Sequence, residues 1–160
     1  MRHDLAIHEA DAARIDAVLE RFLGDSSSAA VLLIDRSGEP LALAGAARTL
    51  DTVSIAALAA GAFSSTAALA RLLGESEFSV LFHEGAKESL HVSIVDDDAI
   101  LLAIFDERTT VGMVRLFARE ASQGLGAILL EARRRPRRTG VLAAPLTPEE
   151  ARSAIRQRPT

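Results

Sequence analysis

The sequence predicts one α+β domain in which a five-stranded antiparallel sheet packs against helices, in the order α-β-β-α-β-β-β-α. Amphipathic helical stretches open the chain, occupy its centre and precede a basic tail. Between them lie short apolar segments separated by turn residues, and these connections are too short for parallel crossovers. At 160 residues and 17.0 kDa, with 49% hydrophobic residues, the chain has the size of a domain with one core.

A helix and a hairpin are expected in the first third of the chain. The helix covers about residues 8–23 and ends at Gly24, because glycine commonly follows the last helical residue. Residues 29–35 form a short apolar run bounded by turn residues, which is typical of a buried strand. Residues 39–45 return as its hairpin partner after a turn that contains Gly38.

A second helix and three strands are expected in the middle of the chain. The helix is capped by Asp51 or Thr52 and ends near Gly74. Strands are expected at residues 78–83, 89–95 and 99–106. The turns between these strands are short, which favours an antiparallel meander.

The central helix is unusual because residues 52–70 carry no charge. An uncharged stretch of 19 residues meets the length test for a membrane span. Its composition disagrees with that interpretation, since eight residues are alanine, six are serine, threonine or glycine, and only five are bulky. Membrane spans are dominated by large apolar side chains. The sequence therefore predicts a helix of a soluble protein and no integral membrane segment.

The helical period divides this stretch into two faces. The face expected to lie on the core comprises Ile55, Leu58, Ala62, Thr66, Leu69 and Leu73. The nearly opposite small-residue face comprises Ala57, Ala60, Gly61, Ser64, Ala68 and Arg71. Two interpretations remain open at this point. Either the rest of the chain covers the helix on all sides, or the small-residue face is offered to a partner.

The last helix is expected to start at Thr109 or Thr110 and to run into a basic tail. Five of the six residues at 133–138 are arginine. They either form a solvated helix end that complements the helix dipole or face an acidic partner or membrane surface. Residues 136–160 are expected to form a flexible Arg-rich linker and a short helix capped by Thr147, which places the domain boundary at residue 135.

Charge and composition exclude several functional classes. The net charge is −4, with ten basic and nineteen acidic side chains in residues 1–130. This acidic body should repel nucleic acid, and the chain has no Trp or Tyr that could stack on bases. The absence of cysteine excludes disulfides and thiolate metal sites. It fits a cytoplasmic location, as does the lack of a signal-peptide core in the first residues.

No constellation of residues predicts an active site. The chain has no phosphate-binding loop, dinucleotide fingerprint or nucleophile-elbow motif. His83 and His91 flank a predicted hairpin without a third ligand, so we expect them at a sheet surface rather than on a metal. Residues 96–98 are three aspartates that we expect to form a turn and not a cation site. We therefore expect no catalytic residue, metal or cofactor.

Four segments resemble those of bacterial roadblock-domain proteins of the MglB type. They are VLLIDRSGEPLALAG, LDTVSIAALAAGAFSSTAALARLLGESEF, FHEGAKESLHVSIV and LLAIFDERTTVGMVRL, and together they span about residues 10–130. The FHEGAKESL stretch and the Leu-Asp-Thr opening of the central helix are the most specific parts. The resemblance implies the roadblock fold, with helices on both faces of the sheet. It also implies a homodimer formed through the central helix and a sheet edge.

The same resemblance implies a function. MglB-type proteins act on MglA, a small Ras-like GTPase of cell polarity and gliding motility. They activate it by remodelling its switch loops without inserting a catalytic residue. The contact surface of the family falls around Ser64 and Ala68, so the small-residue face is the expected GTPase-binding site. The alternative is a roadblock scaffold or paralogue that binds a GTPase or another roadblock protein without stimulating hydrolysis.

Overall fold

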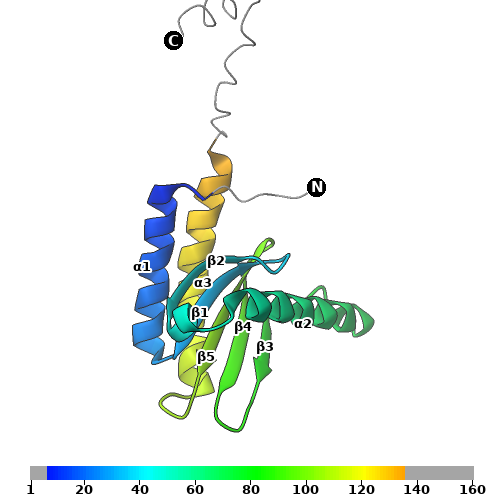
Figure 1. Cartoon of the computed structure of the whole chain (residues 1–160). Coiled ribbons are helices and arrows are strands. Elements are labelled where there is room, and N and C mark those ends of the chain that lie inside the picture. The colour runs from blue at the N-terminus through cyan, green and yellow to red at the C-terminus, as the bar shows by residue number, and fades with distance from the viewer. Residues whose placement is uncertain (1–6, 136–160) are drawn as a thin grey trace, which may run out of the picture.

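A computed structural model describes residues 7–135 as three α-helices and a five-stranded antiparallel sheet with the strand order β2-β1-β5-β4-β3 (Figure 1). The elements are α1 (Glu9–Ser26), β1 (Ala30–Asp35), β2 (Pro40–Gly45), the 3-10 helix η1 (Ala46–Thr49), α2 (Thr52–Leu72), β3 (Val80–His83), β4 (Ser89–Asp96), β5 (Ala99–Phe105) and α3 (Val111–Arg134). The predicted fold class is confirmed, and η1 is the one addition to the predicted order. The predicted linker and the helix after Thr147 lie outside the described residues.

The two middle strands of the sheet, β1 and β5, are its most deeply buried part. All seven residues of β5 are buried, as are the first five of β1. Leu32 of β1 lies opposite Leu43 of β2 on one side and Leu102 of β5 on the other. Continuous apolar runs such as these occur where a strand is covered on both faces. Strands β3, β4 and β5 form the predicted meander.

The sheet separates two hydrophobic layers, with α1 and α3 on one face and α2 on the other (Figure 1). Because successive strand residues point to opposite faces, Val31 and Leu33 pack with α1 and α3, whereas Leu32 and Ile34 pack with α2. Helices on both faces of the sheet, which the resemblance implied, are therefore confirmed.

The end of α1 differs from the prediction. Gly24 lies within the helix, which continues to Ser26. The next residue, Ser27, adopts the left-handed conformation at φ 53° that was expected at the glycine. The Ser26 hydroxyl donates to the Phe22 carbonyl at 2.7 Å and stabilises this added turn. At the starts of the other two helices, Asp51 and Thr110 accept backbone hydrogen bonds as caps.

The predicted core face of α2 is confirmed only in part: Ile55 is partly buried against the core, but the three leucines of this face are not. Leu58, Leu69 and Leu73 were expected to be buried, but they are 74%, 51% and 66% exposed. The residues of α2 that are buried are Ala56, Ala60, Phe63 and Ala70. The helix lies so close to the turn between β1 and β2 that mostly alanine fits between them. Bulky side chains were expected to face inward because burial of large apolar side chains usually drives packing.

Arg36 lies in the turn after β1 and contacts both α2 and the segment that follows it. Its guanidinium lies 5.3 Å from the centre of the Phe63 ring, which is a cation–π distance. The same guanidinium donates two hydrogen bonds to the carboxylate of Glu77, in the segment after α2. One side chain thus connects the middle of α2, the chain beyond its end and the β1–β2 turn.

Candidate functional site

The outward side of α2 presents a strip of small residues. Ala57, Gly61, Ser64, Ala68 and Arg71 are all exposed and form what we call the small-residue strip. The sixth residue predicted for this face, Ala60, is only 5% exposed, so its assignment to the exposed face is wrong. Ala60 follows Ala56 by one helical turn and therefore shares the covered side of the helix. The structure brings the other five predicted residues together on one open surface.

A second strip of exposed residues runs beside the first. Leu58, Leu69 and Leu72 form this leucine strip and are 74%, 51% and 85% exposed. Their spacings of about three and four helical turns place them on one side of α2. Leu58 and Leu69 were predicted to lie in the core, and Leu72 was assigned to neither face. The helical period would have predicted the leucine strip if the alanine-rich side of α2 had been assigned to the core.

The chemistry of the α2 surface suits binding and not catalysis. Arg71 is the single charged residue of the helix. The Ser65 hydroxyl donates to the Gly61 carbonyl at 3.0 Å, and the Thr66 hydroxyl donates to the Phe63 carbonyl at 2.7 Å. Hydroxyls that bond their own backbone are poorly placed as nucleophiles, and no general base lies on the helix. The surface can contribute shape and apolar area to a partner.

Among the helices of residues 7–135, α2 alone has the length and the apolar composition of a membrane span. The core helix of a soluble protein passes the same test, but such a helix is mostly buried. Here only 22% of the apolar stretch of α2 is buried by the described part of the chain. Exposed apolar faces are typical of binding surfaces.

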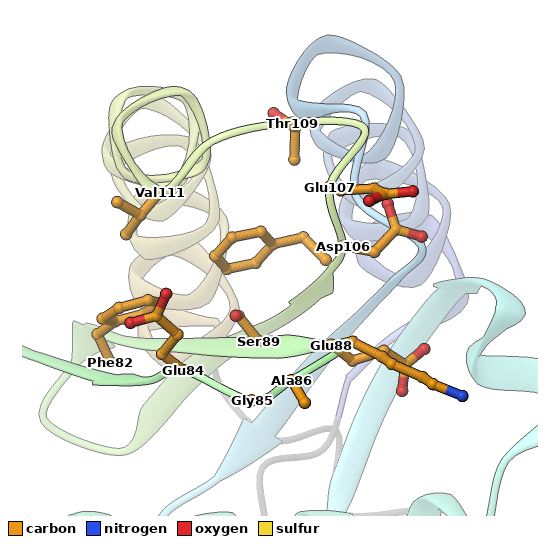
Figure 2. Close-up of a pocket in the computed structure, with 12 residues that line it drawn as sticks. Phe82, Glu84, Gly85, Ala86, Glu88, Ser89, Asp106, Glu107, Thr109 and Val111 are labelled. Carbon is orange, nitrogen blue, oxygen red and sulfur yellow. The ribbon is translucent and has the colours of Figure 1, made fainter.

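A pocket of about 910 Å³ lies at one end of the sheet, between the β3–β4 hairpin and the loop from β5 to α3 (Figure 2). The rings of Phe82 and Phe105, whose centres are 6.1 Å apart, stack within it. The hairpin requires glycine at position 85, because a Cβ there would lie 2.2 Å from the Glu88 carbonyl oxygen. The hairpin belongs to the FHEGAKESL stretch that carried the resemblance.

The pocket by the hairpin has an acidic rim. Figure 2 shows Glu84 on the hairpin side and Asp106 and Glu107 on the loop side. Arg108 donates hydrogen bonds to Asp106 at 2.9 and 3.1 Å, and this lowers the pKa of that carboxyl. This pocket was not predicted from the sequence. The sequence did contain a signal for it. The acidic turns after β3 and β5 both follow strands that run in the same direction in the meander, so they lie at the same end of the sheet.

The two strand histidines lie on opposite faces of the hairpin. His91 pairs with Phe82, and His83 pairs with Leu90, so the alternation of the strands separates the imidazoles. His91 was expected at a sheet surface, but this is wrong, since it is 1% exposed. Burial lowers its pKa, and the charge of Arg115 lowers it further. Within residues 7–135 no group of His, Asp or Glu is arranged to hold a metal.

The arginines at the end of α3 are partly engaged in the fold. Arg133 donates to Asp96 at 2.7 Å and lies 3.3 Å from Asp98, in the predicted turn between β4 and β5. Arg135 donates at 2.7 Å to Asp11, whose side chain is fully buried at the start of α1. Arg133 and Arg135 are therefore ion-paired within the fold, and the interpretation of a solvated helix end is wrong for these two residues. Arg137 and Arg138 lie outside the described part of the chain.

Comparison with known proteins identifies close relatives of this fold. The Roadblock/LC7 domain model matches residues 14–105. The MglB structure of Myxococcus xanthus has 39% sequence identity and a TM-score of 0.74, and the match covers 79% of this chain and 96% of that one. The gliding protein MglB of Thermus thermophilus has 34% identity and a TM-score of 0.76, with 82% and 99% covered.

A further structure, described as MglB with a tetrameric arrangement, has 33% identity and a TM-score of 0.77, and the match covers 82% of this chain and 99% of that one. No curated protein matches the chain. These matches show that the chain has the roadblock fold and that MglB proteins are among its relatives. The matches cover nearly the whole length of the MglB structures.

Proposed function

This chain belongs to the Roadblock/LC7 domain family, and we propose that it is a cytoplasmic, homodimeric regulator of an MglA-type small Ras-like GTPase. The proposal rests on the likeness to MglB structures, at 33–39% identity, and on one observation in this chain. That observation is the long uncovered surface of α2, with its leucine strip and small-residue strip side by side.

The two strips suit two different partners. The leucine strip would be covered by α2 of a second copy, since burial of a leucine side chain contributes about 2 kcal/mol. The small-residue strip would stay outward in the dimer and receive the GTPase, because small side chains allow the backbone of a partner to come close. Continuation of the sheet through its edge strand β3 would add main-chain hydrogen bonds between the copies.

The regulator would act without supplying a catalytic group. The likeness to MglB implies that no arginine is inserted into the nucleotide site, so Arg71, the one charge on α2, would act as a contact residue. Activation would therefore come from holding the switch regions of the GTPase in the conformation that hydrolyses GTP, which is a shift between existing states of the partner. A role in cell polarity and gliding motility is part of the proposal and follows from the likeness to MglB.

Single-turnover GTP hydrolysis by the MglA-type GTPase of the same organism tests the proposal. We expect the wild-type protein to bind the GTP-loaded GTPase and to accelerate hydrolysis. The double variant Ser64→Arg/Ala68→Arg should lose both effects, because two long charged side chains would hold the surfaces apart. Its fold should be retained, since both positions are exposed.

The matched control is Ala13→Arg/Ala17→Arg, which places two arginines at the same spacing on the exposed side of α1. This variant should bind and activate like the wild type. Binding without acceleration would favour the scaffold alternative. Equal loss of binding in both double variants would contradict the assignment of the surface to α2.

A further inference from the structure

A second pocket lies on the face of the sheet opposite to α2. It has a volume of about 390 Å³ and opens between α3 and the strands β3 and β4. We call it the β4–α3 pocket. Its lining residues are Ser79, Val80, His91, Ser93, Ile94, Val95, Arg115, Arg119, Ser122 and Gln123. It is separate from the proposed GTPase-binding surface on α2, although Val80 of the edge strand β3 is part of its lining.

Two secondary structure elements bring polar side chains together in this pocket. His91 and Ser93 are two residues apart on β4 and so point to the same face of the sheet. On α3, the spacing of Arg115, Arg119 and Ser122 places their side chains on one side of the helix. A strand and a helix thus contribute an imidazole, two hydroxyls and two guanidinium groups to one cavity.

Several of these polar groups are buried without a hydrogen-bond partner in residues 7–135. They are both ring nitrogens of His91 and the hydroxyl oxygens of Ser93 and Ser122. A serine inside a helix commonly donates to the carbonyl four residues earlier, but Ser122 does not. Buried polar groups are normally paired, and a polar ligand in this cavity would supply partners to three side chains at once.

The charge of the lining identifies the kind of ligand. Arg115 and Arg119 are one helical turn apart, where like charges repel, and no carboxylate lines the pocket. The charge of Arg115 also reaches the buried His91, whose pKa it lowers after the larger effect of burial. The titratable groups of the lining are His91, Arg115 and Arg119, and none of them is acidic. An anion would relieve the repulsion and accept hydrogen bonds from the hydroxyls.

We propose that the β4–α3 pocket binds the phosphate group of a small organic phosphate. Guanidinium forks pair with phosphate in a bidentate manner, and hydroxyls on both walls can donate to the remaining oxygens of a tetrahedral group. A planar carboxylate has two oxygens and would leave several of these donors unpaired. The volume of the pocket lies in the range of small-molecule sites, about 300–1,000 Å³, so an organic part of the ligand fits beside the anion.

Calorimetric titration of the full-length protein tests the proposal with four probes: inorganic phosphate, AMP, glucose 6-phosphate and succinate. We expect at least one organic phosphate to bind saturably, one per protomer, and about tenfold or more tightly than inorganic phosphate. The double variant Arg115→Ala/Arg119→Ala should weaken that binding at least tenfold. Both arginines are exposed, so this variant should keep the unfolding temperature of the wild type.

The matched control is Arg48→Ala/Arg134→Ala, which removes two exposed arginines outside the pocket. Its net charge equals that of Arg115→Ala/Arg119→Ala. It should bind like the wild type. A second readout is the imidazole NMR signal of His91, whose pKa should rise when the phosphate is bound. No saturable binding of either organic phosphate, equal weakening in both double variants, or tighter binding of succinate or inorganic phosphate would each overturn the proposal.

Discussion

Gly38, in the turn between β1 and β2, lies so close to Ala57 that a Cβ at position 38 would stand 2.9 Å from the Ala57 Cα. The same Cβ would lie 3.5 Å from the Ala60 Cβ. The turn therefore sits directly under α2. This contact explains why a small residue occupies position 60 on the inner side of α2, where Phe63 is the one large buried side chain.

Substitution of Gly38 by alanine should destabilise the domain by about 1–3 kcal/mol. Two causes add up: the residue has φ 96°, which favours glycine, and the added methyl group collides with helix backbone. Thermal unfolding followed by circular dichroism measures the loss. Displacement of α2 should also reduce binding of the proposed GTPase partner.

Gly61→Ala is the control for this substitution, because Gly61 is a helical glycine with nothing within 4 Å of an added Cβ. It should leave stability unchanged or raise it by up to about 1 kcal/mol, since alanine favours the helix. If both variants were equally stable, the close contact under α2 would not matter to the fold.

The order of elements was predictable from the sequence because apolar runs, turn residues and helix caps all agreed with one another. Asp51 and Thr110 were identified as possible caps from their residue type alone. The rotation of α2 about its axis was not predictable, because its inner side is chosen by the approach of Gly38 from a distant turn. Leu58 and Leu69 were therefore assigned to the wrong side.

The candidate site was predictable only in part, for the same reason. Five of the six small-residue positions are exposed, but Ala60 lies under the helix. The β4–α3 pocket depends on which helix covers the outer face of β4, and no local pattern around His91 carries that information. Long-range packing decides both outcomes.

Replacement of two leucines on α2 tests the proposed dimer. Leu69→Ser/Leu72→Ser should weaken self-association, because each leucine contributes roughly 2 kcal/mol when an interface buries it. The fold of the protomer should persist, since both side chains are exposed. Light scattering should give twice 17.0 kDa for the wild type and a lower mass for the variant at the same concentration.

The control for the leucine variant is Leu116→Ser/Leu130→Ser, which changes two exposed leucines of α3. Its mass should equal that of the wild type. A wild-type mass of 17.0 kDa at micromolar concentration would contradict the dimer, and a lower mass in both variants would move the interface away from α2.

The pair of Arg36 and Glu77 should contribute to stability in a pH-dependent manner. Hydrogen bonds from Arg36 lower the pKa of Glu77 below its ordinary value of 4.5, so the folded state favours the charged carboxylate. The contribution is therefore fully present above the unfolded pKa and is lost as pH falls through the lower, folded pKa. Because the pair is partly exposed, it should amount to about 0.5–1 kcal/mol.

Urea unfolding of the wild type and Glu77→Gln measures this contribution. The two proteins should differ near neutral pH and approach the same stability in acid, below the pKa of Glu77. Glu39→Gln removes an exposed carboxylate near the same turn and serves as the control. A difference between wild type and Glu77→Gln that stays constant with pH would show that the ion pair is not its cause.

Arg135, the last residue that the structure describes, contacts Asp11, and we expect the domain boundary at this position. The buried carboxylate of Asp11 accepts a hydrogen bond of 2.7 Å from Arg135, and its other oxygen has no hydrogen bond in residues 7–135. A chain that ends after residue 135 keeps this contact, as well as the pair of Arg133 with Asp96. It should therefore unfold at the temperature of the full-length protein.

A chain that ends after Glu131 should be less stable, because it loses both ion pairs and leaves a buried carboxylate poorly compensated. The cost should be about 1–3 kcal/mol, because the Asp11 carboxylate would keep only its longer contact with Arg14, at 3.6 Å. In the chain that ends at 135, Arg135→Ala should reproduce much of this loss. Arg134→Ala should not, since Arg134 is exposed and has no ion pair with any residue at 7–135. Calorimetry of the full-length protein and these four variants measures the differences. Equal unfolding temperatures for the two truncated chains would place the domain boundary before Arg133 instead of at residue 135.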